Sequence, residues 1–401
     1  MNSLSRVSLL LLMASWSVMA SNVLLKDDSN TEDGTHSKTV ANLHANKDTS
    51  WLDDFLAKLG GNDELNLDDG IDWGILPGPF VNPLQGFGIG VAAIGLYSPE
   101  DRHENTQVST IGIKSYGSTS GSYGLGIENR TYFSDDTWRL EIDSWISHSP
   151  QSYWGIGRKN AESNKLATEV EAKVFQVTPK ALYRLLNNTY LSVGWDFLSY
   201  ANINAVGDAL TADELVDRKV SGLTVGLAYD SRDFALNAYN GMLIRLDYDG
   251  YYSFIGSDNK FARTRFNYRQ YHKVAPSMVL AWELYAEGLN GDIPWFTMSE
   301  MGIDGRMRGY YQGQYRDKYQ INTQIELRQQ LNHRHGFAYW LGAGNVAGNV
   351  AGNEKDLFNE TWLPTVGIGY RLTFKPRVNI RFDMGFGKDS SGFYFQINEA
   401  F

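Results

Sequence analysis

The sequence predicts an all-β protein, a transmembrane antiparallel β-barrel of about 16 strands with a short N-terminal leader that is partly helical and partly disordered. From about residue 80 onward, apolar residues alternate with polar ones, which is the pattern of strands with two different faces. Aromatic residues make up 13% of the chain and 40 residues are glycine. A barrel in lipid has such a composition because only every second residue must be apolar. After the N-terminus no segment has ~18 consecutive apolar residues, so strands must make any membrane crossing.

Residues 1–20 have the pattern of a signal peptide. Arg6 supplies a positive start, an apolar core follows from Leu9 to Val18, and Val18-Met19-Ala20 carries the small residues of a cleavage site. A membrane anchor is the alternative, although the apolar run is short for spanning a bilayer. The sequence therefore predicts export.

Residues 21–74 form an acidic leader that we expect in the periplasm. Lys26 to Asn46 is polar without periodicity and is predicted to be disordered. A short helix is predicted over residues 50–60, since Ser50 can cap its first turn and Gly60 suits its end. One face of this helix is apolar and carries Trp51, Leu52, Phe55, Leu56 and Leu59. The helix is either a plug of the barrel lumen, a contact with the membrane surface, or a tethered element that binds nothing specific.

Residues 75–401 are predicted to form the barrel. Between Val378 and Phe386, apolar residues alternate with Asn379, Arg381 and Asp383, and a soluble sandwich would not explain so charged a second face. Strands are predicted to start near residues 86, 107, 122, 137, 152, 168, 189, 220, 241, 261, 277, 319, 336, 363, 377 and 392. The count is even, as closure of a single-chain bacterial barrel requires, and the shorter turns should face the periplasm. The longest connection, residues 290–318, should then lie on the outer side.

Composition argues against several other classes of function. The formal net charge of -10 gives no basic surface for nucleic acid, and the lack of cysteine excludes disulfides, thiolate zinc sites and a lipoprotein anchor. His333-Arg334-His335 could hold a metal, but the motif falls in a short turn, where solvated side chains are the simpler explanation. Ser147 and His148 are adjacent on a strand and face opposite sides. We therefore expect no enzyme activity, no catalytic or metal-binding residues and no cofactor.

The C-terminus resembles the signal that outer-membrane barrels present to their assembly machinery. Phe393, Phe395, Ile397 and Phe401 are predicted to share one face of the last strand, and Phe401 is the final residue. Glu399 interrupts this face near the water interface, where a charge costs little. An ordinary last strand is the alternative. The resemblance implies the outer membrane of a Gram-negative bacterium as location, with outer-membrane lipid and the assembly machinery as partners.

The long loop contains Gly305-Arg306-Met307-Arg308-Gly309-Tyr310. Here the sequence resembles the bacterial surface antigen family, the barrel part of BamA/TamA-type insertases and two-partner secretion transporters. That family carries V-R-G-F/Y in a long loop that folds back into the lumen, and Met307 stands in place of Val. Further similar pieces occur in the family's order, namely Tyr153-Trp154-Gly155-Ile156-Gly157, Asp230-Ser231-Arg232-Asp233 with Asn240-Gly241, and Glu326.

An arginine carried into the lumen needs a carboxylate partner, because an unpaired charge in a confined site is costly. Glu326 points inward by strand parity and is the first candidate to anchor Arg308. Gly309 permits a tight backbone, and Tyr310 can pack against the inner wall. Alternatively, Arg308 is one of many solvated loop arginines. The family often has a second acid on the next strand, where this chain has Gly342, so Asp383 or Glu283 would have to replace it.

The resemblance implies a role in membrane assembly or transport. The leader is too short for the family's N-terminal periplasmic POTRA domains, which receive substrate, so a full insertase cycle is not expected. Three hypotheses remain: a helper of protein or lipid insertion or translocation, a passive transport pore, and a structural surface protein. None of the three hypotheses specifies a substrate.

Overall fold

A computed structural model describes residues 51–67, 70–82, 85–99, 106–163, 167–349 and 356–401. Thr49–Phe401 forms one compact unit. The predicted signal peptide and the predicted disordered stretch from Lys26 to Asn46 lie outside the described residues. Within the described ranges, no helix has the length and the apolar character needed to cross a membrane.

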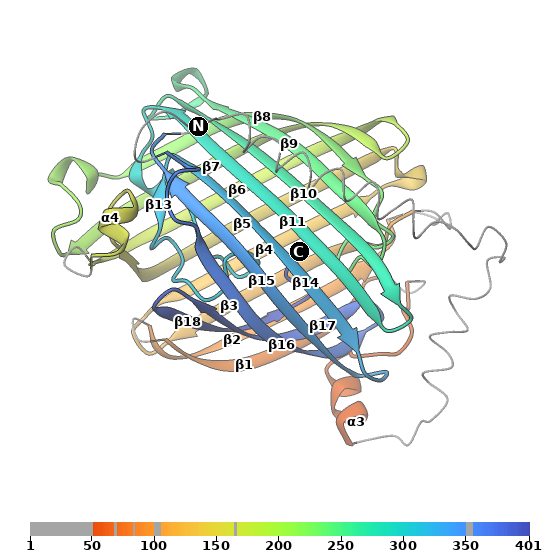
Figure 1. The fold of residues 1–401 in the computed structure, drawn as a ribbon. Coiled ribbons are helices and arrows are strands. Elements are labelled where there is room, and N and C mark those ends of the chain that lie inside the picture. Colours follow the sequence, from red (N-terminus) through yellow and green to blue (C-terminus); the bar gives the residue numbers. More distant parts are fainter. Residues whose placement is uncertain (1–50, 68–69, 83–84, 100–105, 164–166, 350–355) are drawn as a thin grey trace, which may run out of the picture. The chain divides into compact units, whose positions relative to one another are not determined.

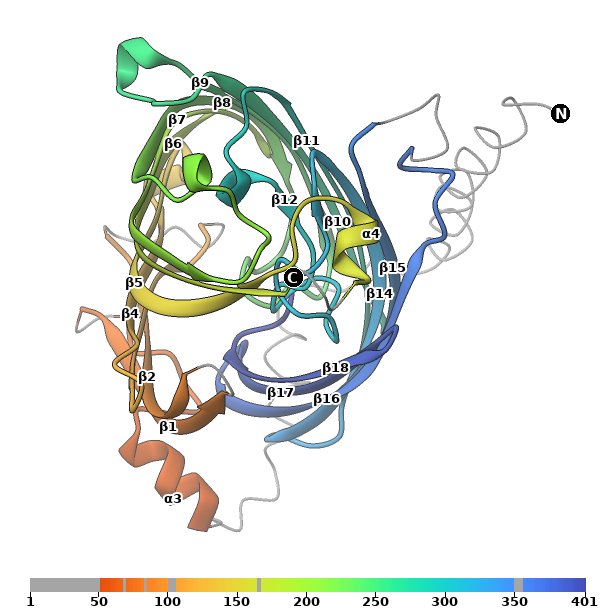
Figure 2. The ribbon, with the colours of Figure 1, turned by 90° about the vertical axis from the view of Figure 1, so that its left-hand side faces the viewer.

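One antiparallel sheet of 16 strands, in which successive strands are neighbours, forms the wall of this unit (Figures 1 and 2). Its strands are β1 (Asp72–Asn82), β2 (Gly86–Tyr97), β3 (Ser109–Ser118), β4 (Tyr123–Tyr132), β5 (Trp138–Tyr153), β6 (Thr168–Leu186), β7 (Thr189–Val206), β8 (Arg218–Asp230), β9 (Gly241–Tyr251), β10 (Phe261–Ala275), β11 (Met278–Gly291), β14 (Tyr319–Gln330), β15 (His335–Ala347), β16 (Leu363–Lys375), β17 (Val378–Gly387) and β18 (Ser390–Ile397). The remaining elements are α3 (Trp51–Lys58), α4 (Arg158–Ala161), η1 (Ser134–Asp136), η3 (Ala212–Glu214), η4 (Ser253–Ile255), η5 (Trp295–Thr297) and the paired strands β12 (Ser299–Glu300) and β13 (Arg316–Asp317).

The alternating sequence gives this wall two different faces. On β17, Met384 and Phe386 point outward and are about half exposed, at 48% and 45%. Arg381 and Asp383 precede them on the same strand with the opposite parity and are buried toward the lumen. Successive side chains of a strand point to opposite faces, so on β17 the polar half lines the interior and the apolar half faces lipid.

The number of strands agrees with the prediction, but two assignments were wrong. β1, Asp72–Asn82, was not predicted, and the strand expected near residue 152 is the end of β5. Pro77 and Pro79 hid β1, because proline argues against a strand unless that strand lies at the edge of a sheet. The missed strand and the surplus strand cancel in the count. Successive strands alternate in direction, so the missed β1 reverses the direction predicted for the four strands that follow it, β2 to β5. From β6 onward the predicted and observed directions agree.

The connections differ between the two ends of the barrel. The end that carries the two-residue turns 187–188, 276–277 and 376–377 is called the turn end here, and the opposite end is called the loop end. The loop end carries the longest connection, residues 292–318, together with the connections 207–217 and 252–260. The predicted division into a short-turn periplasmic end and a long-loop outer end is therefore met in part. The turn end also carries the connections 98–108 and 231–240, and the loop end carries the two-residue turn 388–389.

β1 and β18 are the two edges of the sheet, and in the described part of the chain no backbone hydrogen bonds pair them. The backbone N of Ile75 donates to the oxygen of Leu59, 2.8 Å away, so this N–H points away from β2. In an antiparallel strand every second residue points its N–H to the same side. Pro77 and Pro79 therefore stand at the next two positions of the open edge, and neither has an N–H to donate.

The two edges overlap instead of pairing, and this overlap is called the seam. Gly74 and Gly78 are on the inward side of β1, since they alternate with the exposed Trp73 and Ile75. A Cβ atom at Gly78 would lie 3.2 Å from the ring of Phe395, which is on the outward side of β18. A Cβ atom at Gly74 would lie 2.2 Å from the ring of Phe374. The inward face of β1 thus covers the outward face of the last strands, and at Gly74 a side chain would collide with the Phe374 ring.

The predicted helix is present as α3. Asp53 and Asp54 lie in its first turn, where carboxylates favour the helix, and Gly60 follows it with φ of +85°. Figures 1 and 2 show α3 outside the ring of strands, so in this structure it does not plug the lumen. It lies at the turn end, where Asp53 pairs with Arg334 of the turn between β14 and β15.

Candidate functional site

The connection 292–318 between β11 and β14 folds into the barrel (Figure 2). Its two arms are joined by the pairing of β12 with β13, so the segment between them returns as a closed loop. Arg308 lies in this segment and is completely buried, with 0% of its surface exposed. The loop thus carries a cation from the loop end of the barrel to its inner wall.

Two carboxylates hold the Arg308 guanidinium. Its Nη2 is 2.6 Å from Glu326 Oε2 on β14, and its Nη1 is 2.5 Å from Asp383 Oδ2 on β17. The guanidinium also lies 3.6 Å from the ring centre of Trp340 on β15. A guanidinium that binds two carboxylates and stacks on a ring is fixed in both position and plane. The expected contact with Glu326 is therefore present, and Asp383 is the second acidic partner.

Three more arginines surround these carboxylates. Arg328 Nε is 2.8 Å from Glu326, while Arg371 and Arg381 are 2.5 Å and 2.9 Å from Asp383. Arg371 also reaches Glu399, 2.8 Å away, just beyond the end of β18. Burial alone would raise the pKa of Glu399, but Arg371 and Arg328 together hold this pKa below its ordinary range. This wider network could not be predicted, because alternation shows which side chains face the lumen but not which of them contact one another.

The backbone around Arg308 fits the wall closely. Met307 and Gly309 have φ of +52° and +108°, and the backbone N of Gly309 donates to the Tyr394 hydroxyl, 2.8 Å away. A Cβ at Gly309 would lie 2.6 Å from the backbone of Phe386, so only glycine fits this position. The Tyr310 hydroxyl donates to the oxygen of Pro364, 2.6 Å away. All four residues of the predicted motif therefore contact the inner wall, and Met307 is 2% exposed.

Gly342 leaves no space for the acid expected from the resemblance. A Cβ at this position would be 2.7 Å from the Thr323 oxygen and 3.0 Å from Gln324 Cβ. Glu283, the other candidate, binds Arg269 at 2.9 Å and lies 3.8 Å from Arg306 instead of Arg308. The second carboxylate comes from β17, two strands further along the sheet than β15.

The other pieces of the resemblance lie at the two ends of the barrel. At the loop end, Gly157 donates its N–H to the oxygen of Arg316, and the rings of Tyr153 and Trp295 are 4.9 Å apart, so this piece supports the long loop. At the turn end, Asp230 binds Arg232 at 2.8 Å and Arg139 at 2.7 Å. The latter pair fixes the connection between β8 and β9 to β5.

The C-terminal residues do not share one face, contrary to the prediction. Phe393 and Phe395 point outward, but β18 ends at Ile397 and Asn398 has φ of +73°. This turn directs the last residues into the lumen, where Phe401 is 7% exposed and packs in a cluster with Ala238, Tyr271 and Ala281. Asparagine tolerates positive φ better than most residues, which is the one sequence signal for the turn. The assembly role of the four residues stays a prediction.

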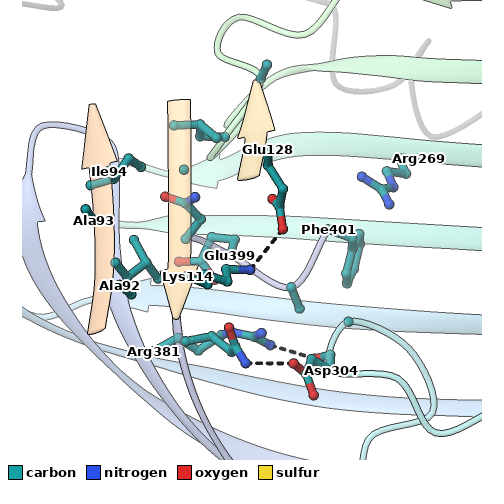
Figure 3. A pocket seen from close by; sticks show the side chains of 18 residues that line it. Ala92, Ala93, Ile94, Lys114, Glu128, Arg269, Asp304, Arg381, Glu399 and Phe401 are labelled. Atoms are coloured by element: carbon teal, nitrogen blue, oxygen red, sulfur yellow. Dashed lines mark hydrogen bonds and ion pairs between the residues drawn. The ribbon is translucent and has the colours of Figure 1, made fainter. Parts of the chain in front are cut away.

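A cavity of about 290 Å³ lies beside this C-terminal tail (Figure 3). Arg381, Asp304, Glu399 and Phe401 line it, and across it Lys114 binds Glu128 at 3.1 Å. A second cavity of about 300 Å³ is lined by Lys180, Asp196, Arg263 and Arg265 among others. Side chains of both signs of charge line each of the two cavities.

Three comparisons with known proteins bear on this site. A model of the Omp85 superfamily domain matches residues 107–401. Among solved structures, CdiB from Escherichia coli has 10% identity and a TM-score of 0.55, covering 82% of this chain and 62% of that one. BamA from Haemophilus ducreyi lacking POTRA domains 1–3 has 12% identity and a TM-score of 0.49, covering 90% of this chain and 81% of that one. No curated protein sequence matches significantly. The chain thus spans less than two thirds of the CdiB structure, and the likeness to CdiB concerns the fold alone.

Proposed function

The chain belongs to the Omp85 superfamily, and from this membership we propose that it is a non-enzymatic helper of protein or lipid insertion or translocation, acting at the seam between β1 and β18. As an outer-membrane β-barrel of this superfamily it presents its apolar outer face to lipid. The observation that carries the proposal is the seam itself, where two unpaired strand edges overlap. Edges held by side chains separate more easily than edges held by a hydrogen-bonded ladder.

The position of the long loop supports action at the seam over passage through the lumen. Arg308 and its carboxylates tie the loop to β14 and β17 inside the barrel, and Phe401 folds inward beside them. For a passive pore, the long loop and Phe401 would have to leave the lumen. Moving the loop would break the buried ion pairs of Arg308. A structural surface protein would not need an unpaired seam.

A disulfide across the seam tests the proposal. Gly78→Cys with Phe395→Cys places two thiols where the edges overlap, in a chain that has no other cysteine. The matched control is Ile113→Cys with Ile127→Cys, which joins the paired strands β3 and β4. Each variant is expressed in a deletion strain, which is scored for its outer-membrane proteins and lipids.

We expect the deletion to change this composition. We also expect the oxidised seam variant to fail in restoring it, and restoration to return after reduction. The control should restore it in both states. An unchanged composition in the deletion strain, or full activity of the oxidised seam variant, would falsify the proposal. Steady ion conductance of the wild-type protein in planar bilayers would favour the pore.

A further inference from the structure

Residues 51–63, called the latch segment here, hold the two edges of the sheet together at the turn end. The latch segment is bound to β1 through the hydrogen bond from Ile75 to the oxygen of Leu59. It is bound to the far side of the seam through Arg334, which lies 2.6 Å from Asp53 and 2.7 Å from Asp63. The latch segment therefore contacts β1 on one side of the seam and the turn between β14 and β15 on the other side.

The buried face of α3 strengthens this connection. Leu56 is 2% exposed and belongs to one cluster with residues from both sides of the seam. Leu76 and Leu96 come from β1 and β2, and Val378 and Ile380 come from β17. Val378 and Ile380 have the strand parity of the outward Met384 and Phe386. The cluster thus lies within the seam, between the inward face of β1 and the outward face of β17. Figures 1 and 2 show α3 itself outside the ring of strands, on the side of the wall that faces lipid.

Not all apolar side chains of α3 are buried in this cluster. Trp51 and Phe55 stand one helical turn apart and are 78% and 51% exposed. Ala57 and Lys58 are exposed as well, but at 100° per residue Ala57 projects to nearly the opposite side of the helix from Phe55. Two large aromatic side chains are thus left outside the protein on one side of an amphipathic helix.

The exposed aromatic residues continue the lipid-facing surface of the barrel. Ile71, Trp73 and Ile75, at the start of β1, are exposed on its outward side at the same end. The end of α3 lies against the backbone of β1 near these residues. A Cβ atom at Gly60, just after the helix, would be only 2.2 Å from the backbone oxygen of Trp73. Tryptophan and other aromatic residues gather where barrels meet the membrane–water interface.

We propose that α3 is an interfacial helix whose Trp51 and Phe55 insert into the lipid leaflet around the turn end, next to the seam. An amphipathic helix with this division of faces lies in the plane of the interface with its apolar side in the lipid. Lipid then covers the part of α3 that the barrel leaves exposed, and holds the latch segment on the seam. This interaction does not require that the protein inserts or translocates anything.

Single cysteines test the inference in this cysteine-free chain. Trp51→Cys, Phe55→Cys and the matched control Ala57→Cys are each labelled with a small fluorophore. The full-length variants are then placed in phosphatidylethanolamine–phosphatidylglycerol vesicles with nitroxide groups on the acyl chains. Iodide serves as the quencher from water. The unheated gel mobility of each variant shows whether its barrel is folded.

We expect the lipid nitroxide to remove most of the fluorescence at positions 51 and 55 and little at position 57, with the opposite order for iodide. Equal iodide quenching at all three positions would mean that α3 stands in water. Protection of positions 51 and 55 from both quenchers would mean that a protein surface, such as a second copy, covers them. Either result overturns the inference. The readout is independent of the assay for the proposed function, so each can fail separately.

Discussion

Arg308 shows how one residue can fix a long loop. Its guanidinium joins β14 to β17 through Glu326 and Asp383, and the side chain is inaccessible to solvent. Removing one member of a buried ion pair leaves the remaining charge without compensation, which costs more than the pair itself contributes. The remaining arginines around Glu326 and Asp383 reduce this cost but do not replace the link to the loop.

We expect Arg308→Ala to lower the stability of the folded barrel by about 3–5 kcal/mol, because two buried carboxylates lose a partner. Glu326→Gln should act in the same direction. The measurement is the temperature at which the fast-migrating folded band converts to the slow band. Lys159→Ala, at an exposed residue of α4, is the control. If Arg308→Ala and Glu326→Gln both melt like the wild type, the loop anchor does not stabilise the barrel.

Glu399 makes the same network sensitive to acid. Its pKa lies below the ordinary glutamate value of 4.5, since Arg371 and Arg328 outweigh the effect of burial. A lowered carboxyl pKa stabilises the fold fully above the pKa of the unfolded chain, and this contribution is lost as the pH falls through the folded value. Glu399→Gln should therefore melt below the wild type at pH 7, and the difference should shrink below pH 4.5. A difference that is constant with pH would contradict this assignment.

Among the secondary-structure elements, β1 and β18 were the hardest to predict, each for a physical reason. Alternation identified the interior strands because each has one face in lipid and one in the lumen. β1 was missed because its prolines are acceptable only at an open edge, which a sequence does not reveal. At the C-terminus Phe401 has the same strand parity as Phe393 and Phe395, with Glu399 as an interruption, yet the turn at Asn398 sends Phe401 inward. Alternation could not foresee that the end of the chain leaves the sheet.

The latch segment makes Arg334 the central residue of the turn between β14 and β15. The sequence singled out its two histidine neighbours as a conceivable metal site, whereas the structure uses the arginine to bind Asp53 and Asp63. Arg334→Ala should free the latch segment, so that the amides of α3 exchange hydrogen faster while the interior strands stay protected. Lys58→Ala, on the exposed side of the same helix, is the matched control. Unchanged exchange of α3 in the Arg334 variant would show that apolar packing alone holds it.

At the scale of the whole molecule, the barrel is continuous through fifteen strand pairs and depends on packing at the seam. It should still migrate faster unheated than boiled on a denaturing gel, because the hydrogen-bonded part unfolds as one unit. No shift on boiling would contradict the barrel itself. The sequence predicted this architecture from strand parity. The Arg308–Glu326 contact was predicted from the inward parity of Glu326 together with the resemblance to the surface antigen family, whose long loop folds into the lumen. The overlap of the seam depends on contacts between distant glycine and phenylalanine residues, which parity does not specify.

The two prolines of β1 have one more consequence. A bare strand edge is ordinarily a hazard, since it offers a template on which a neighbouring chain can pair and start an aggregate. Here Pro77 and Pro79 offer no N–H, and the N–H of Ile75 is already occupied by Leu59. A foreign strand therefore finds no run of free N–H donors from Ile75 to Pro79 on β1. On this side of the seam the wall stays open without offering a neighbouring chain a template to pair with.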